Sequence, residues 1–110
     1  MGAAATGRTV AVVGLGRVGL PLAVCFADRG LDVIGVDVDA RRVQAVAAGR
    51  MPFMETGMQS VLDRVRGAGR MRCTTSVAEA ALADDIVLTL GAGDVGQHSR
   101  TLFAARGVRA

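Results

Sequence analysis

The sequence contains neither tryptophan nor tyrosine, and its only aromatic residues are three phenylalanines. Proteins that bind single-stranded nucleic acid without sequence preference stack the bases on aromatic side chains, and three scattered phenylalanines do not provide such a platform. Lysine is absent as well, so all 13 Lys/Arg positions are arginines, and the net charge is only +3. We therefore expect no nucleic acid partner.

Cysteine and histidine are also scarce. Cys25 and Cys73 lie far apart in the sequence, which is not the pattern of a small disulfide-stabilised secreted domain. We expect both thiols to be buried and inert rather than nucleophilic. The single histidine, His98, has no neighbouring cysteine or pair of carboxylates, so no metal site is assigned.

Long hydrophobic runs are missing. No run approaches the ~18 apolar residues of a membrane-spanning helix, so we expect no membrane partner. Residues 1–8 are small or polar and contain no apolar signal-peptide core, which predicts a cytoplasmic location.

Hydrophobic residues nevertheless make up 51% of the 110 residues, enough for one domain with a modest core. Their spacing predicts strands at residues 9–13, 32–36, 71–74 and 86–90, and helices at residues 17–29, 40–48, 57–66 and 76–82. Asp39 and Ser76 are expected as helix N-caps, and Glu79 as the partner of Ser76 in a capping box. The alternation predicts an α/β fold, a Rossmann-type doubly wound parallel sheet that is incomplete, with about four strands.

A glycine-rich segment, Gly14-Leu15-Gly16-Arg17-Val18-Gly19, follows the first predicted strand and precedes the first predicted helix. This is the context in which a G-x-G-x-x-G pattern indicates dinucleotide binding. The first glycine permits a tight turn, the second lets a pyrophosphate approach the backbone, and the third lets helix and strand pack closely. The alternative is a turn that uses glycine only for packing.

An acidic residue, Asp37, ends the second predicted strand, about 20 residues beyond the glycine segment. A carboxylate at this place can accept hydrogen bonds from both hydroxyls of the adenosine ribose, and it repels a 2′-phosphate. Asp37 therefore favours NAD over NADP. Arg41 and Arg42 keep NADP open as the alternative, because an arginine beside the ribose can accept that phosphate.

Further segments extend the pattern over residues 8–90. They are G-L-G-R-V-G-L-P-L-A at 14–23, G-V-D-V-D-A-R-R-V at 35–43, the Pro52–Glu55–Gly57 loop, and the segments at 69–75 and 83–87. In this order they resemble the NAD-binding domain of the UDP-glucose/GDP-mannose dehydrogenase family. The Leu20-Pro21 pair and the Pro52 loop disfavour other Rossmann dehydrogenases.

The resemblance implies oxidation of the primary alcohol of a UDP- or GDP-sugar to the uronate, with NAD as cofactor. It also implies a cofactor-binding set made of Gly14, Leu15, Gly16, Arg17, Val18, Gly19, Asp37 and Arg42. Within this set the glycines hold the pyrophosphate, Asp37 holds the ribose, and Arg42 lies near the adenosine. Arg17 occupies a position that is often tyrosine in the family, and it either reaches the phosphates or is solvated.

Residues 91–110 depart from the family pattern. Gly91-Ala92-Gly93 stands where the family usually has Thr-Pro, and we interpret residues 91–110 as an atypical tail, out of frame or weakly helical. The family's catalytic cysteine, lysine and aspartate belong to a later substrate-binding half, so no catalytic residue is assigned.

We accordingly expect a truncated dehydrogenase that does not turn over alone and that needs the missing half to bind its nucleotide sugar. The alternative is a non-catalytic dinucleotide-binding module or a remnant. An unpaired sheet edge would favour homo-oligomers.

Overall fold

A four-stranded parallel sheet forms the centre of the protein, for which a computed structural model describes residues 7–89. Its strands are β1 (Thr9–Val13), β2 (Asp32–Val36), β3 (Met71–Thr74) and β4 (Asp85–Leu88). They lie in the order β3-β2-β1-β4 with every pair parallel. The predicted α/β class is therefore confirmed. The tail from 91 to 110, with His98, lies outside the described residues.

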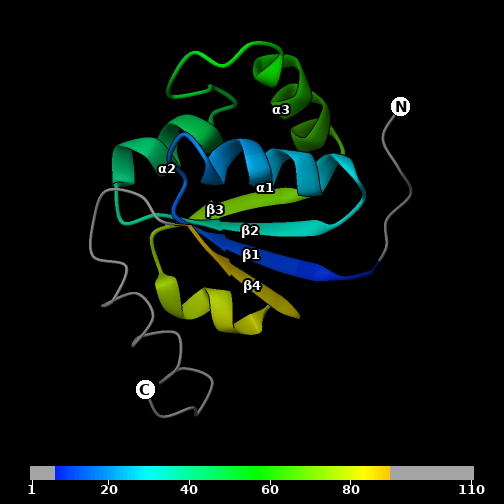
Figure 1. Cartoon of the computed structure of the whole chain (residues 1–110), viewed down its shortest axis with the longest axis vertical. Coiled ribbons are helices and arrows are strands. Elements are labelled where there is room, and N and C mark those ends of the chain that lie inside the picture. Colours follow the sequence, from blue (N-terminus) through cyan, green and yellow to red (C-terminus); the bar gives the residue numbers. More distant parts are fainter. Residues whose placement is uncertain (1–6, 90–110) are drawn as a thin grey trace.

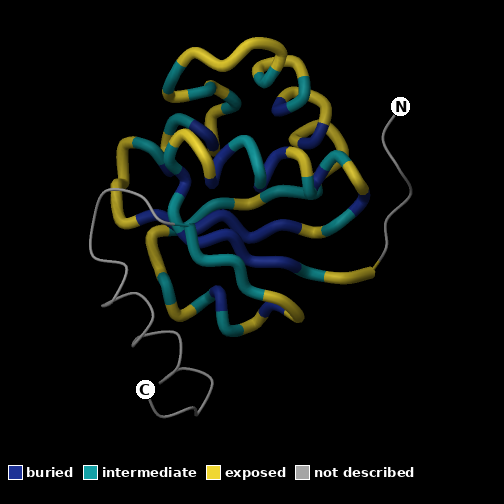
Figure 2. The backbone as a smooth tube through the Cα atoms, viewed as in Figure 1, coloured by how far each residue is buried: buried dark blue, intermediate teal, exposed yellow. Residues whose placement is uncertain are grey.

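Helices cover both faces of this sheet. Those between the strands are α1 (Gly19–Asp28), α2 (Ala40–Ala47), α3 (Met58–Gly67) and the 3₁₀-helix η1 (Val77–Leu82). Figure 1 shows α1 and α3 on one side of the sheet and η1 on the other. The two central strands, β1 and β2, are mostly buried, whereas β3 and β4 at the edges are intermediate or exposed (Figure 2).

Two hydrophobic clusters separate the layers. On the α1/α3 face, alternate residues of the strands, such as Val10, Val12 and Val33, pack against Leu20 and Leu62. The opposite face contains a smaller cluster beneath η1. Burying each valine or leucine side chain contributes roughly 1.5–3 kcal/mol, so the larger cluster is the main source of stability. It packs α1 against β1 and β2.

Element bounds follow the sequence pattern closely. The first three strands have the predicted bounds, whereas the fourth covers 85–88 rather than 86–90, and residue 90 is not described. Helix α1 begins two residues later than predicted, because residues 16–18 still belong to the glycine-rich turn. The predicted N-cap is confirmed, since the Asp39 carboxylate accepts hydrogen bonds from the N–H groups of Arg41 and Arg42.

The predicted capping box at Ser76 and Glu79 is wrong. The Ser76 side chain caps no N–H group, and the segment is a 3₁₀-helix. The Glu79 carboxylate instead accepts hydrogen bonds from Arg72 at 2.8 Å and from the Thr74 hydroxyl at 2.6 Å. The Ser76 N–H donates to the Thr74 hydroxyl at 3.0 Å instead, so it is not the partner of Glu79.

The expectation that both cysteines are buried is wrong for Cys25, which is exposed. Its neighbours Ala23, Val24 and Ala27 form the buried side of α1, and Cys25 falls on the other side. Cys73 is partly buried, and this burial raises the pKa of its thiol to about 11. Its thiolate population at neutral pH is correspondingly small.

Candidate functional site

The carboxyl ends of β1, β2 and β4 converge on one edge of the sheet. The connections from β1 to β2 and from β2 to β3 pass over the α1/α3 face, whereas the connection from β3 to β4 passes over the η1 face. The crossover therefore changes sides between β1 and β4. In open α/β sheets, ligands bind just outside the carboxyl ends of the strands at such a point.

The glycine-rich turn lies at this edge, and its shape depends on two glycines. Gly14 has a positive φ of 98°, a conformation that residues with side chains rarely adopt, and its N–H donates to Val36 O at 2.7 Å. A Cβ atom on Gly19 would overlap the carbonyl oxygen of Gly14. The structure thus gives Gly14 the tight turn and Gly19 the close helix–strand contact that the sequence predicts.

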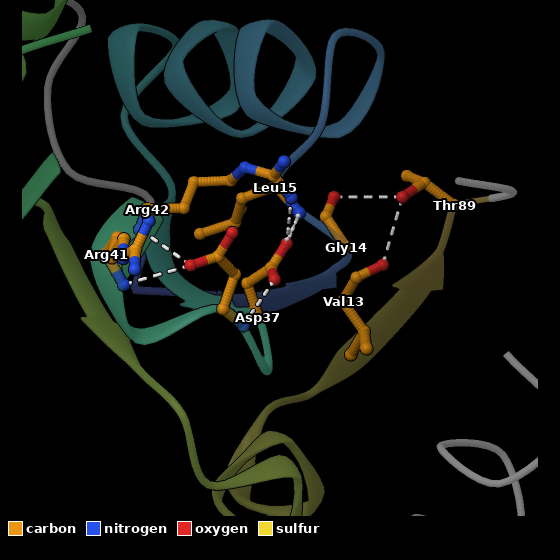
Figure 3. Close-up of polar contacts among 8 residues, drawn as sticks. Val13, Gly14, Leu15, Asp37, Arg41, Arg42 and Thr89 are labelled. Carbon is orange, nitrogen blue, oxygen red and sulfur yellow. Dashed lines mark hydrogen bonds and ion pairs between the residues drawn. The ribbon is translucent and has the colours of Figure 1, made fainter. Parts of the chain in front are cut away.

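Thr89 fixes the same turn from the end of β4. Its hydroxyl lies 2.8 Å from the carbonyl oxygen of Gly14 and 3.1 Å from that of Val13, and the two carbonyls share its single hydrogen (Figure 3). The Thr89 N–H also donates to Val13 O at 3.0 Å. The hydroxyl therefore fastens β4 to the point where the chain leaves β1.

Four consecutive backbone N–H groups at the start of α1 form a candidate anion-binding site. Within residues 7–89, the N–H groups of Gly16, Arg17, Val18 and Gly19 donate to no protein acceptor. Such N–H groups at a helix start, together with the helix dipole, favour negatively charged groups such as phosphates. A Cβ atom built on Gly16 would meet no atom within 4 Å, so this side of the turn is open.

Asp37 is the buried acidic residue that contacts the turn through Leu15, and its side chain is only 8% exposed. Its carboxylate accepts hydrogen bonds from Leu15 N–H at 2.7 Å, Asp39 N–H at 2.8 Å and Arg42 Nη1 at 3.1 Å (Figure 3). Burial alone would raise the pKa of Asp37. The hydrogen bonds from Asp39, Leu15 and Arg42, with the positive charge of Arg42, outweigh burial and lower that pKa. Asp37 is therefore a carboxylate at neutral pH.

A cleft of about 350 Å³ opens in front of these groups. It is lined by Gly16, Arg17, Asp39, Arg41, Arg42, Pro52 and Phe53. The guanidinium of Arg17 lies over the Phe53 ring, 5.1 Å from its centroid. Three arginines and one exposed aspartate give the lining a positive excess, which suits a ligand with more than one negative charge.

The residues singled out in the sequence take different places around this cleft. Gly16, Arg17 and Arg42 line it, whereas Leu15 is buried in the core and its N–H is taken by Asp37. Val18 is 69% exposed at the start of α1.

Four further residues lie at this site that were not predicted from the sequence to belong to it, namely Asp39, Pro52, Phe53 and Thr89. For Thr89, its place at the end of the last predicted strand was the available signal, because strand ends in such sheets surround the ligand. Pro52 and Phe53 belong to the loop that carries part of the family resemblance, but only the packing of that loop before α3 places them at the cleft.

Among residues 7–89, no group of three or more His, Cys, Asp or Glu side chains is arranged to hold a metal ion. No helix in the same part of the chain is long and apolar enough to cross a membrane.

Comparison with known proteins gives one family. The model for the "UDP-glucose/GDP-mannose dehydrogenase family, NAD binding domain" matches residues 8–92. The chain is 39% identical over 77 residues to GDP-mannose 6-dehydrogenase of Pseudomonas putida, covering 70% of this chain and 18% of that protein. It is 42% identical over 82 residues to UDP-glucose 6-dehydrogenase of Pseudomonas aeruginosa, covering 74% and 18%.

Solved structures give the same result. A UDP-glucose dehydrogenase from Pyrobaculum islandicum superposes with a TM-score of 0.78 at 30% identity, covering 96% of this chain and 27% of that one. GDP-mannose dehydrogenase from Pseudomonas aeruginosa, solved as a ternary complex, gives 0.76 at 31% identity, with coverage of 91% and 24%. The chain thus spans about 18% of the length of the curated relatives it matches.

Proposed function

Because the chain belongs to the UDP-glucose/GDP-mannose dehydrogenase family, we propose that it serves an enzyme that oxidises the primary alcohol of a UDP- or GDP-sugar to the uronate. The matched region is the family's NAD-binding domain, and NAD is its cofactor. Residues 8–90 form this domain in our proposal. The sugar nucleotide would bind through a substrate half that these 110 residues do not contain.

The observation that carries the site assignment is the row of N–H groups at residues 16–19 that have no acceptor among residues 7–89, next in sequence to Leu15, whose N–H donates to the buried carboxylate of Asp37. The N–H groups would receive the diphosphate of NAD. A carboxylate has about four acceptor positions, and the protein already uses three on Asp37. Asp37 then has room for one ribose hydroxyl rather than both, and the Arg42 guanidinium beside it is the neighbouring donor.

The chain's own contribution to the reaction is binding and orientation. When NAD is bound, its nicotinamide accepts the hydride from the alcohol carbon. The glycine-rich turn, fastened by Thr89, would hold the diphosphate, and Asp37 with Arg42 beside it would hold the adenosine ribose. We assign no catalytic residue to this chain, and we expect the 110 residues alone not to turn over.

The cofactor assignment is tested by calorimetric titration of the 110-residue chain with NAD and NADP. We expect NAD to bind at least about tenfold more tightly, because an ionised Asp37 repels a 2′-phosphate. Equal affinity for the two would contradict the role given to Asp37. Failure of NAD to bind at millimolar concentration would contradict the proposed function itself.

Activity separates the enzyme proposal from a non-catalytic binding module. The chain mixed with UDP-glucose or GDP-mannose and NAD should produce no NADH. A version joined to the substrate half of a relative should produce it. A fusion that folds and binds NAD yet forms no NADH would favour the binding module.

Location and assembly are proposals as well. Cys25 and Cys73 are both free, as expected in a reducing compartment, which supports a cytoplasmic location. Within the described residues β4 pairs only with β1, and an unpaired edge of this kind supports self-association into homo-oligomers.

A further inference from the structure

Arg17 is a charged side chain that the described part of the chain leaves without a counter-ion. Four other arginines pair with carboxylates, namely Arg8, Arg42, Arg64 and Arg72. Arg17 is exposed and forms no ion pair with any residue between 7 and 89. An exposed arginine with no partner usually samples many conformations, but a ring contact holds this one in place.

The ring belongs to Phe53, whose centroid lies 5.1 Å from the guanidinium carbon of Arg17. Arginine stacks on aromatic rings through the flat face of its guanidinium group, which leaves the N–H groups at the edge free to donate. Phe53 is itself anchored, because it is partly buried and packs against the larger hydrophobic cluster. The ring therefore restrains Arg17 without using its donors.

The loop that carries Phe53 is fixed at its beginning by Gln59 on α3. The Gln59 amide nitrogen donates to the Gly49 carbonyl at 2.7 Å, and its amide oxygen accepts from Met51 N–H at 3.1 Å. One side chain thus satisfies both backbone groups where the loop leaves α2. The Phe53 ring consequently has a defined position before any ligand arrives.

We propose that Arg17, held against Phe53, binds the diphosphate of the dinucleotide through its free guanidinium N–H groups. The proposal rests on the proposed function and adds to it a side chain that recognises the phosphates. Arg17 and Gly16 line the same cleft, and the free N–H groups of residues 16–19 are immediately adjacent. Arg42 is already paired with Asp37 at 3.1 Å. Arg17 and Arg41 also line the cleft and form no ion pair within residues 7–89, and of these two it is Arg17 that directly follows Gly16 in the turn. The planar fork of arginine matches phosphate oxygens, and the preformed stack lowers the entropy lost on binding.

The test measures affinities of the 110-residue chain for NAD, ADP-ribose and adenosine, by calorimetry or by NMR titration for the weak nucleoside. Arg17→Gln removes the charge at an exposed position. The matched control is Arg29→Gln, the same change at the opposite end of α1, where the described residues show no ion pair. Circular dichroism checks that each variant is folded.

We expect Arg17→Gln to weaken NAD and ADP-ribose by about tenfold and to leave adenosine unchanged, because only the first two carry a diphosphate. Arg29→Gln should change none of the three by more than about twofold. Phe53→Leu should weaken NAD by about threefold, since it removes the ring that restrains Arg17.

Unchanged NAD affinity in Arg17→Gln overturns the proposal while the proposed function stands. An equal loss for adenosine also overturns it, since Arg17 would then act on the cleft as a whole. If the unmodified chain binds no NAD, the proposed function and this inference fail together, so the outcomes are distinguishable.

Discussion

Replacing Asp37 by asparagine perturbs the contact between the glycine-rich turn and the end of β2 while keeping the side chain's shape. The carboxylate holds the N–H groups of Leu15 and Asp39, and an amide has only one oxygen to offer them. Whichever way the amide is turned, an NH₂ group faces a backbone donor. The change therefore affects stability directly, apart from any effect on NAD.

The magnitude follows from burial. The amide oxygen can replace Oδ2, which accepts from both Leu15 N–H and Arg42, and the NH₂ group then faces the part-buried N–H of Asp39. Leaving such a donor without a partner costs about 1–3 kcal/mol. The pair with Arg42 is partly exposed on the arginine side, so its loss adds at most about 1 kcal/mol. We expect Asp37→Asn to lower the free energy of unfolding by about 2–3 kcal/mol, out of roughly 5–15 kcal/mol for a domain of this size. Asp37→Ala would also leave a cavity, so it would confuse loss of fold with loss of binding.

The assay is urea unfolding followed by circular dichroism, because the chain has no tryptophan or tyrosine for fluorescence. Asp39→Asn is the matched control. Asp39 is exposed and acts as an N-cap, a role that asparagine fills equally well, so the expected change is under about 0.5 kcal/mol.

The stability difference between the parent and Asp37→Asn at acidic pH provides a second test. The pKa of Asp37 is lowered in the folded state, so its contribution is complete above the unfolded value of about 3.9 and is lost as the pH falls through the folded value. Asparagine does not titrate, and the stability difference between parent and variant should shrink below about pH 4. Asp28 and Glu79 also have lowered pKa values, but they titrate in both proteins and cancel. A variant as stable as the parent at pH 7, or a difference that is the same at pH 3, would refute the reasoning.

Three further predictions follow from the same structure. Gly19→Ala should unfold the domain or destabilise it by more than about 3 kcal/mol, because a Cβ atom there overlaps the backbone. In the same urea titration the control Gly57→Ala should cost only about 1–2 kcal/mol, because Gly57 has a φ of 81° but open space around it. Iodoacetamide at pH 8 should label Cys25 readily and Cys73 only after unfolding, since burial raises the pKa of Cys73 to about 11, and equal labelling rates measured by mass spectrometry would contradict this. Thr89→Val should lower the thermal midpoint by about 4–8 °C through the loss of a hydroxyl donor worth about 1 kcal/mol, whereas Thr89→Ser should retain most of the stability.

Local patterns accounted for most of the fold. β1 and β2 are short runs rich in valine and isoleucine, and their bounds follow from that composition, whereas β3 (Met-Arg-Cys-Thr) was predictable mainly from its place after the glycine-rich break at residues 67–69. The Asp39 cap was predictable for the same reason, since its partners lie two and three residues away. The Ser76 capping box failed because Glu79 found donors on a neighbouring strand, which no local pattern contains.

Residue order was enough to predict the glycine-rich turn, the acidic residue after the second strand, and the parallel α/β class, because these depend on spacing along the chain. The contacts that complete the site depend on the tertiary fold. The Leu15 side chain is buried and its N–H donates to Asp37, and the Thr89 hydroxyl, at the far end of the described chain, donates to the turn. Phe53 came from the loop before α3 to lie beneath Arg17. These contacts join residues that are distant in sequence, and they form only because packing of α1 and α3 on one face brings the strand ends and that loop together.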